Sequence, residues 1–192
     1  MGRYIAILLF LLPIALRANE PKENFFLIDS LVQEISEEIS KSINSEVQPL
    51  KVNFSEHPAY WLVKQHLINN LSKKQITIAD TLCENNLNIN ILKIAVEYKL
   101  IKADEKLNRL ITVDIDGYLK NKQITPIGKK KLVFSDTITT DDVVVVEASP
   151  YAFAKATVPH PKESFFEKYF QPMIYVSSAI IVTVLFFTLR SK

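Results

Sequence analysis

One stretch near the carboxyl end constrains this chain more than any other, because no charged residue occurs from Tyr169 to Leu189. As a helix, this stretch is about 31 Å long, enough to cross a hydrocarbon core of about 30 Å. Its Ile, Val, Leu and Phe side chains each favour membrane insertion by roughly 0.3–0.6 kcal/mol. The sequence therefore predicts a transmembrane helix over residues 170–189 in the lipid bilayer and a cytoplasmic tail over residues 190–192.

The amino end has the pattern of a secretory signal peptide over residues 1–18. Arg3 supplies a positive n-region, a short apolar stretch follows, and Ala18 suits the position before a cleavage site. An uncleaved anchor is the alternative interpretation. A cleaved signal peptide and the terminal helix together predict a single-pass membrane protein of type I topology. Its amino-terminal domain would be exported, periplasmic or extracellular, with the inner membrane as its site in a Gram-negative cell.

Composition excludes several classes of function. The 192 residues carry a formal net charge of only +2, so no nucleic-acid partner is expected. The single cysteine, Cys83, permits neither an intrachain disulfide nor a cysteine-rich zinc site. The three glycines, Gly2, Gly117 and Gly128, are too far apart to form a phosphate-binding loop.

The exported region, residues 19–148, begins with helical patterns. Apolar residues recur at three- and four-residue steps from Ile28 to Ile43, which predicts an amphipathic helix that packs on the core or, alternatively, binds a partner helix. A second helix is expected over residues 58–72. Short strands are expected over residues 48–54 and at residues 76–78.

The second half of this region changes to an alternating pattern. Apolar residues occur at every second position from Leu92 to Leu100 and again from Ile111 to Ile115, which predicts an antiparallel hairpin. Another strand is expected over residues 131–139. Residues 143–146 are predicted to form an edge strand or to begin the packing towards the membrane. Residues 149–169, rich in proline and aromatic residues, are predicted to form a semi-extended juxtamembrane stalk.

The predicted fold class is therefore α+β, with amphipathic helices followed by an antiparallel β meander and one C-terminal transmembrane helix. This order of elements, with alternating residues such as Ile94, Val96, Val113 and Ile115, resembles the exported α/β modules of bacterial envelope assembly proteins. The resemblance is to the TolB amino-terminal and penicillin-binding-protein-activator type and covers residues 27–139. It implies a non-catalytic adaptor, and no functional residue carries over from it.

The histidines do not have the spacing of a metal site. His57 and His66 do not share one face of a helix at the i, i+4 spacing of a zinc-binding pair, and His160 lies between two prolines. Asp114 and Asp116 point to the same side of one strand. They could hold a hard cation such as Ca²⁺ or act as an acid/base pair, but alternation alone explains them as the solvated face of that strand.

The remaining polar residues select no catalytic site. Cys83 lacks a flanking signature of a nucleophile, no serine lies in a GxSxG elbow, and Asp136, Asp141 and Asp142 surround a threonine-rich turn. Asn53 and Asn70 match the glycosylation sequon. We therefore predict no catalytic, cofactor-binding or metal-binding residue and no cofactor.

The sequence favours a non-enzymatic membrane protein whose exported domain binds a protein partner in an envelope assembly or transport complex. One alternative is a membrane-anchored hydrolase that uses Cys83, or a serine, with a histidine. Another is a eukaryotic or viral type I surface protein. Small residues from Ser177 to Thr183 in the anchor also allow a homodimer.

Overall fold

The computed structural model describes residues 20–81, 83–101, 106–159 and 165–190. The chain divides into two compact units, Met1–Pro159 and His160–Lys192. The first unit contains an α+β domain, and the second contains helix α5 (Phe165–Arg190). The predicted signal peptide, residues 1–18, lies outside the described residues.

Strand β3 is the centre of a mixed sheet. β2 pairs antiparallel with one side of β3, while β4 and β5 pair antiparallel with successive parts of its other side. β1 runs parallel to the first residues of β2, so the sheet is not purely an antiparallel meander. The strands are β1 (Leu50–Phe54), β2 (Asn85–Ile101), β3 (Lys106–Lys120), β4 (Ile124–Pro126) and β5 (Lys130–Thr139).

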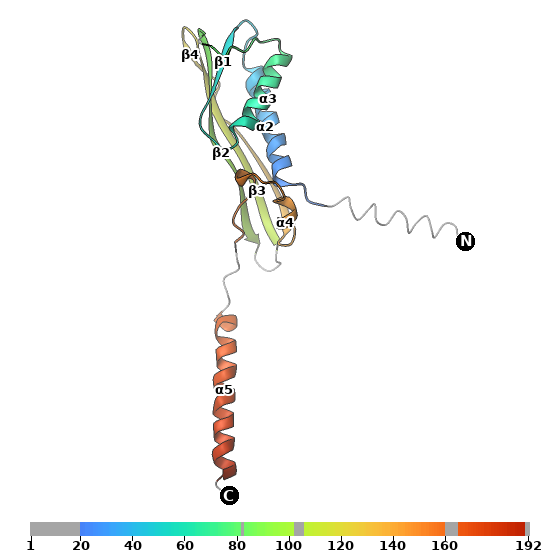
Figure 1. Cartoon of the computed structure of the whole chain (residues 1–192), viewed down its shortest axis with the longest axis vertical. Helices are drawn as coiled ribbons and strands as arrows, with labels where there is room; N and C mark the ends of the chain where they lie inside the picture. The colour runs from blue at the N-terminus through green and yellow to red at the C-terminus, as the bar shows by residue number, and fades with distance from the viewer. Residues whose placement is uncertain (1–19, 82, 102–105, 160–164, 191–192) are drawn as a thin grey trace, which may run out of the picture. The chain divides into compact units, whose positions relative to one another are not determined.

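Two helices, α2 (Asn24–Lys41) and α3 (Tyr60–Lys73), cover one face of this sheet (Figure 1). The predicted periodicity of α2 explains its packing, because Ile28, Val32 and Ile35 are completely buried. Burial of one such side chain stabilises the fold by about 1.5–3 kcal/mol. The predicted class, α+β with one candidate C-terminal transmembrane helix, is confirmed.

The β2–β3 hairpin is also confirmed, with one change of register. Between Ile91 and Lys93 the register shifts, so Ile91 and Ile94 are both buried although they are three positions apart. Leu92 lies at this bulge and is 49% exposed. The prediction that Leu92 belongs to the buried face is therefore wrong, because the bulge reverses the alternation at that residue.

Two other segments differ from the predicted elements. Ile78 makes only an isolated bridge with Leu50, where the sequence predicted a short strand. The four valines Val143–Val146 form a short helix, α4, rather than an edge strand. Val143 and Val146 are buried and Val144 is 81% exposed, so the apolar run packs only one side of a helical turn.

The first part of the predicted stalk packs on the domain. Ala152–Ala154 form a short 3-10 helix, η1, in which Phe153 is 9% exposed and Ala154 is completely buried. Ala156 and Val158 also pack against the core. These apolar side chains bury area against the domain, which a semi-extended stalk would leave in water.

Helix α3 ends in a hydrogen-bonded cap. The amide of Gln75 donates to the carbonyl of Ser72 (2.9 Å), and the amide of Ile76 donates to that of Leu71 (3.1 Å). This pattern is a Schellman motif, which requires a left-handed residue at the position of Gln75. Gln75 has φ of 61° and an exposed side chain, so an L-residue occupies a conformation that favours glycine.

We expect Gln75→Gly to raise the free energy of unfolding by about 1 kcal/mol, because it removes the left-handed strain and no buried contact. Denaturant unfolding of the detergent-solubilised protein measures this change through Trp61, the only tryptophan of the chain. Gly128→Ala is the control, since Gly128 has φ of 86° and an added Cβ meets nothing within 4 Å. It should lower stability by backbone strain alone, and equal stability of all three proteins would contradict both assignments.

Candidate functional site

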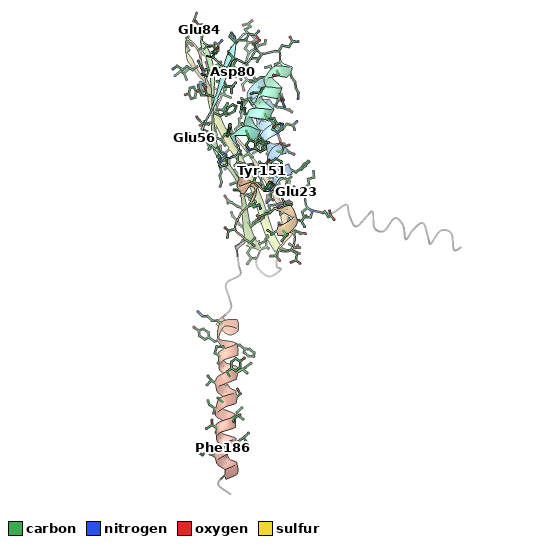
Figure 2. The ribbon with its side chains drawn as sticks, viewed as in Figure 1. Glu23, Glu56, Asp80, Glu84, Tyr151 and Phe186 are labelled. Atoms are coloured by element: carbon green, nitrogen blue, oxygen red, sulfur yellow. The ribbon has the colours of Figure 1, made fainter. Side chains whose placement is uncertain are left out.

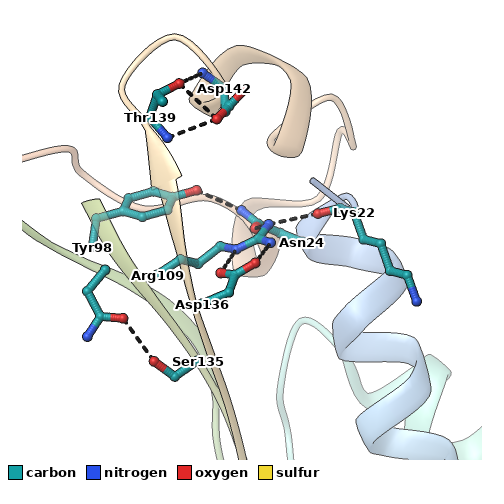
Figure 3. A network of polar contacts seen from close by, with 9 residues as sticks. Lys22, Asn24, Tyr98, Arg109, Ser135, Asp136, Thr139 and Asp142 are labelled. Atoms are coloured by element: carbon teal, nitrogen blue, oxygen red, sulfur yellow. Dashed lines mark hydrogen bonds and ion pairs between the residues drawn. The ribbon is translucent and has the colours of Figure 1, made fainter. Parts of the chain in front are cut away.

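The most extensive polar cluster of the domain surrounds Arg109, a completely buried residue of β3 (Figure 3). Its guanidinium forms a two-pronged ion pair with Asp136 of β5, with Nε to Oδ1 at 2.8 Å and Nη2 to Oδ2 at 2.5 Å. Nη1 donates to the carbonyl of Lys22 (2.7 Å) and to Oδ1 of Asn24 (2.9 Å). Arg109 thus joins the two strands to the start of α2.

Asn24 extends the cluster to two more elements. Its Nδ2 donates to the hydroxyl of Tyr98 on β2 and to the carbonyl of Ala154 in η1, both at 2.9 Å. Burial raises the pKa of Tyr98 to about 12, although the hydrogen bond from Asn24 opposes this shift. The hydroxyl therefore stays protonated at neutral pH. Because these groups already contact one another and are largely buried, the cluster fits a structural role better than a catalytic one.

Sequence reasoning missed Arg109. Its position in the alternating pattern was the available indication, because the alternation that buries Leu107 and Ile111 also places Arg109 on the buried face. Asp136 was assigned to the surroundings of a threonine-rich turn, but it is the carboxylate that pairs with this arginine. The pairing of β3 with β5 places Asp136 opposite Arg109. Local sequence does not show this pairing, so it could not identify the acid that neutralises Arg109.

The histidines do not meet in the domain. Nε2 of His66 on α3 lies 2.7 Å from Oδ1 of Asp29 on α2 and links the two helices. His57 precedes α3, and its Nδ1 accepts the amide of Ala59 at 3.0 Å. His160 lies outside the described residues.

Cys83 is not linked to a histidine. Its Sγ donates to the carbonyl of Asn85 at 3.0 Å, and among the described residues no hydrogen bond connects it to His57 or His66. The geometry thus brings together none of the pairs from which a thiol nucleophile would be activated in a cysteine hydrolase.

Asp114 and Asp116 occupy alternate positions of β3, but Asp114 is only 7% exposed, so it does not lie on a fully solvated face. Oδ2 of Asp114 pairs with Nζ of Lys129 at 3.0 Å. Oδ1 of each aspartate is buried and has no hydrogen-bond partner within the described chain. The described residues contain no group of three or more His, Cys, Asp or Glu side chains arranged to hold a metal ion.

The other candidates have local structural contacts. Asp142 accepts the amide and the hydroxyl of Thr139, both at 2.8 Å, and closes the turn after β5. Asp141 is exposed. Asn53 donates to Oδ1 of Asn88 at 3.2 Å, and Asn70 is only 7% exposed, which leaves little room for a glycan on its side chain.

The outer edge of β5 has an unpaired backbone. The amide of Ile127 donates to the carbonyl of Gly117, so odd-numbered residues of β3 direct their backbone groups towards β4 and β5. Their partners in β5 are even-numbered, as Ile111 opposite Phe134 shows. The amides and carbonyls of residues 131, 133, 135 and 137 therefore point outwards, and no strand of the described chain pairs with them.

Helix α5 is long and apolar enough to cross a membrane, judged by its length and composition. Its candidate span is Lys168–Thr188, with a mean hydropathy of 1.8 and no buried residue. Apolar side chains on different sides of the helix, such as Ile174, Ile180 and Phe186, are 52%, 57% and 59% exposed. A helix that is apolar all round needs either a protein core or lipid around it.

No protein family matches this sequence, and no curated protein does. Among solved structures, a minor lipoprotein from Acinetobacter baumannii is similar, with 12% sequence identity and a TM-score of 0.32. The match covers 48% of this chain and 66% of the lipoprotein, just under two thirds of its length. This neighbour is a bacterial lipoprotein, and the finer resemblance to the TolB amino-terminal or penicillin-binding-protein-activator type stays a prediction.

We expect Arg109→Met to lower the free energy of unfolding by about 3–5 kcal/mol, because it leaves Asp136 and the carbonyl of Lys22 without their charged donor. The double variant Arg109→Met/Asp136→Leu should recover part of this loss, since it removes both charges. Denaturant midpoints of the three proteins test the prediction. If the double variant is no more stable than Arg109→Met, the unpaired Asp136 carboxylate does not destabilise the single variant, and this explanation is wrong.

We expect the free energy of unfolding to fall as the pH drops below about 6.5, because the imidazole of His57 is then protonated. Partial burial lowers the pKa of His57 from 6.5, so the unfolded chain takes up its proton at a higher pH than the folded chain does. Protonation also removes the Nδ1 acceptor for Ala59. In His57→Asn the amide oxygen replaces the acceptor without titrating, so the loss of stability between about pH 7 and about pH 5 should become smaller. An unchanged slope would exclude His57 as its source.

Proposed function

We propose that this protein is a non-enzymatic, single-pass membrane protein whose exported domain binds a protein partner in an envelope assembly or transport complex. The observation that carries this proposal is α5. Its apolar side chains lie on all sides of the helix, and its candidate span is long and apolar enough to cross a bilayer. Lipid is the solvent in which such a helix is stable.

The direction of insertion follows from charge and from the amino end. Arg190 and Lys192 lie directly after the apolar span, and cytoplasmic flanks are enriched in such residues. The predicted signal peptide, residues 1–18, supports export of the part of the chain that follows it. We therefore assign the domain to the exported side, with residues 190–192 in the cytoplasm. The boundaries 1–18, 170–189 and 190–192 remain part of this proposal, while the domain is extended from residue 148 to Pro159, where the first compact unit ends.

We assign partner binding to the outer edge of β5. Outward amides and carbonyls of an edge strand can pair with an extended segment of another protein, which adds a strand to the sheet. Lys129, Lys130 and Lys131 stand at one end of this strand, and they discourage pairing of two identical edges there. Lys129 and Lys130 already pair with Asp114 and Glu38, so a partner segment with an acidic residue opposite Lys131 would complement this end.

The first test places a photo-crosslinking residue at Thr137 in the full-length protein in its native membrane. We expect one discrete adduct that Ser135→Pro abolishes, because proline removes an outward amide and blocks strand addition while it leaves the inward ladder to β3 intact. Ser135→Ala is the matched control, since both variants lose the bond from the Ser135 hydroxyl to Asn108 (2.8 Å). Lys64, exposed on α3, is the control site for the crosslinker.

An adduct that persists in Ser135→Pro, or that forms equally from Lys64, would contradict binding at this edge. Alkaline carbonate washing of the same membranes tests the anchor separately. Release of the full-length protein into the supernatant would contradict membrane insertion of α5, whatever the result of crosslinking.

A further inference from the structure

Four aromatic side chains of the domain form a partly exposed surface, here called the aromatic patch: Phe25, Phe26, Trp61 and Tyr151. Phe25 and Phe26 belong to the first turn of α2, Trp61 to the first turn of α3, and Tyr151 directly precedes η1. Phe26 is 52% exposed and Tyr151 is 36% exposed. Figure 2 draws the side chains of the domain and labels Tyr151 of this patch.

The rings hold one another in place. The centroid of Tyr151 lies 4.9 Å from that of Phe25 and 5.2 Å from that of Trp61. The stacked ring of Phe153, 5.4 Å from Tyr151, supports them from the core. Asn24, next to Phe25, is fixed by the Arg109 cluster. The patch is therefore a preorganised surface built from three separate segments.

The rim of the patch is amphipathic. A hollow of about 410 Å³ lies between Lys22, Glu23, Phe25, Phe26 and Asp29. Nζ of Lys22 lies 5.2 Å from the centroid of the Phe26 ring. Aromatic rings and a lysine with an apolar stem are the side chains that settle at the boundary between acyl chains and phosphate headgroups.

The covalent connection keeps this surface near a bilayer. The first compact unit ends at Pro159 and α5 begins at Phe165, so five residues, 160–164, connect them. Such a connection spans at most about 20 Å. A surface tethered at this length meets the membrane at a high effective concentration, so even weak contacts are occupied.

We infer that the aromatic patch docks on the headgroup layer of the bilayer in which α5 is anchored, with its rings at the acyl boundary and Lys22 at the phosphates. This inference rests on the proposed function, because it requires α5 to be inserted. The docked surface holds one side of the domain against the membrane. The patch belongs to α2, α3 and the residue before η1, whereas the proposed partner site is the outer edge of β5.

Trp61 makes the inference directly measurable, since it is the only tryptophan of the chain. The full-length protein is reconstituted in phosphatidylcholine bilayers with either brominated or unbrominated acyl chains. Bromine quenches a tryptophan only at close range. We expect Trp61 to lose most of its emission in brominated bilayers and to emit at shorter wavelength than in the detergent-solubilised protein.

Phe26→Ser is the test variant, because Phe26 is exposed and its loss should not unfold the domain. It should reduce the quenching of Trp61. Val133→Ser is the matched control, since Val133 is 49% exposed on β5 outside the patch. It should leave the quenching unchanged. Equal quenching in both variants would overturn the assignment of the patch.

The failures of the two proposals are distinguishable. Trp61 that is not quenched in proteoliposomes resistant to carbonate washing overturns docking of the patch and leaves the anchor intact. Release of the protein by carbonate overturns the proposed anchor itself. A shift of emission to shorter wavelength that depends on protein concentration, without quenching by bromine, would assign the patch to contact between two copies and overturn the lipid assignment.

Discussion

The buried ion pair between Arg109 and Asp136 is the interaction on which the domain depends. A completely buried guanidinium is costly unless a carboxylate and further acceptors surround it. Here the carboxylate of Asp136, the carbonyl of Lys22 and the side-chain oxygen Oδ1 of Asn24 are those acceptors. Asp136 belongs to β5, while Lys22 precedes α2 and Asn24 is its first residue. Arg109 therefore connects β3 with β5 and with the start of α2.

The same cluster links the domain to its surfaces. Asn24 also binds Tyr98 and the carbonyl of Ala154, which fixes η1 against the start of α2. This contact brings Tyr151 next to Phe25 and Trp61 and so builds the aromatic patch. A cluster without a catalytic arrangement thereby positions the surface that we assign to the membrane. It also holds the strand whose outer edge we assign to a partner.

Local pattern predicted much of the fold. The three- and four-residue period of α2 and the alternation of β2 and β3 gave element type and buried face, because burial of one face imposes these periods. The candidate sites followed less well. Asp136 was expected near a threonine-rich turn and pairs with Arg109, while Cys83, His57 and His66 lie in separate local contacts. Partners across strands cannot be read from local sequence.

The sequence by itself determined that a charge-free apolar segment near the carboxyl end follows an α+β region, because hydropathy and periodicity are properties of neighbouring residues. Only the tertiary structure decided that β1 runs parallel to β2, that Leu92 lies in a bulge and that residues 149–158 pack on the domain. Each of these depends on the register and packing of segments far apart in the chain. Arg109 shows the reason most clearly. Its buried charge is stable only because Asp136, Lys22 and Asn24 accept its hydrogen bonds, and Asn24 is in turn held by Tyr98 and Ala154.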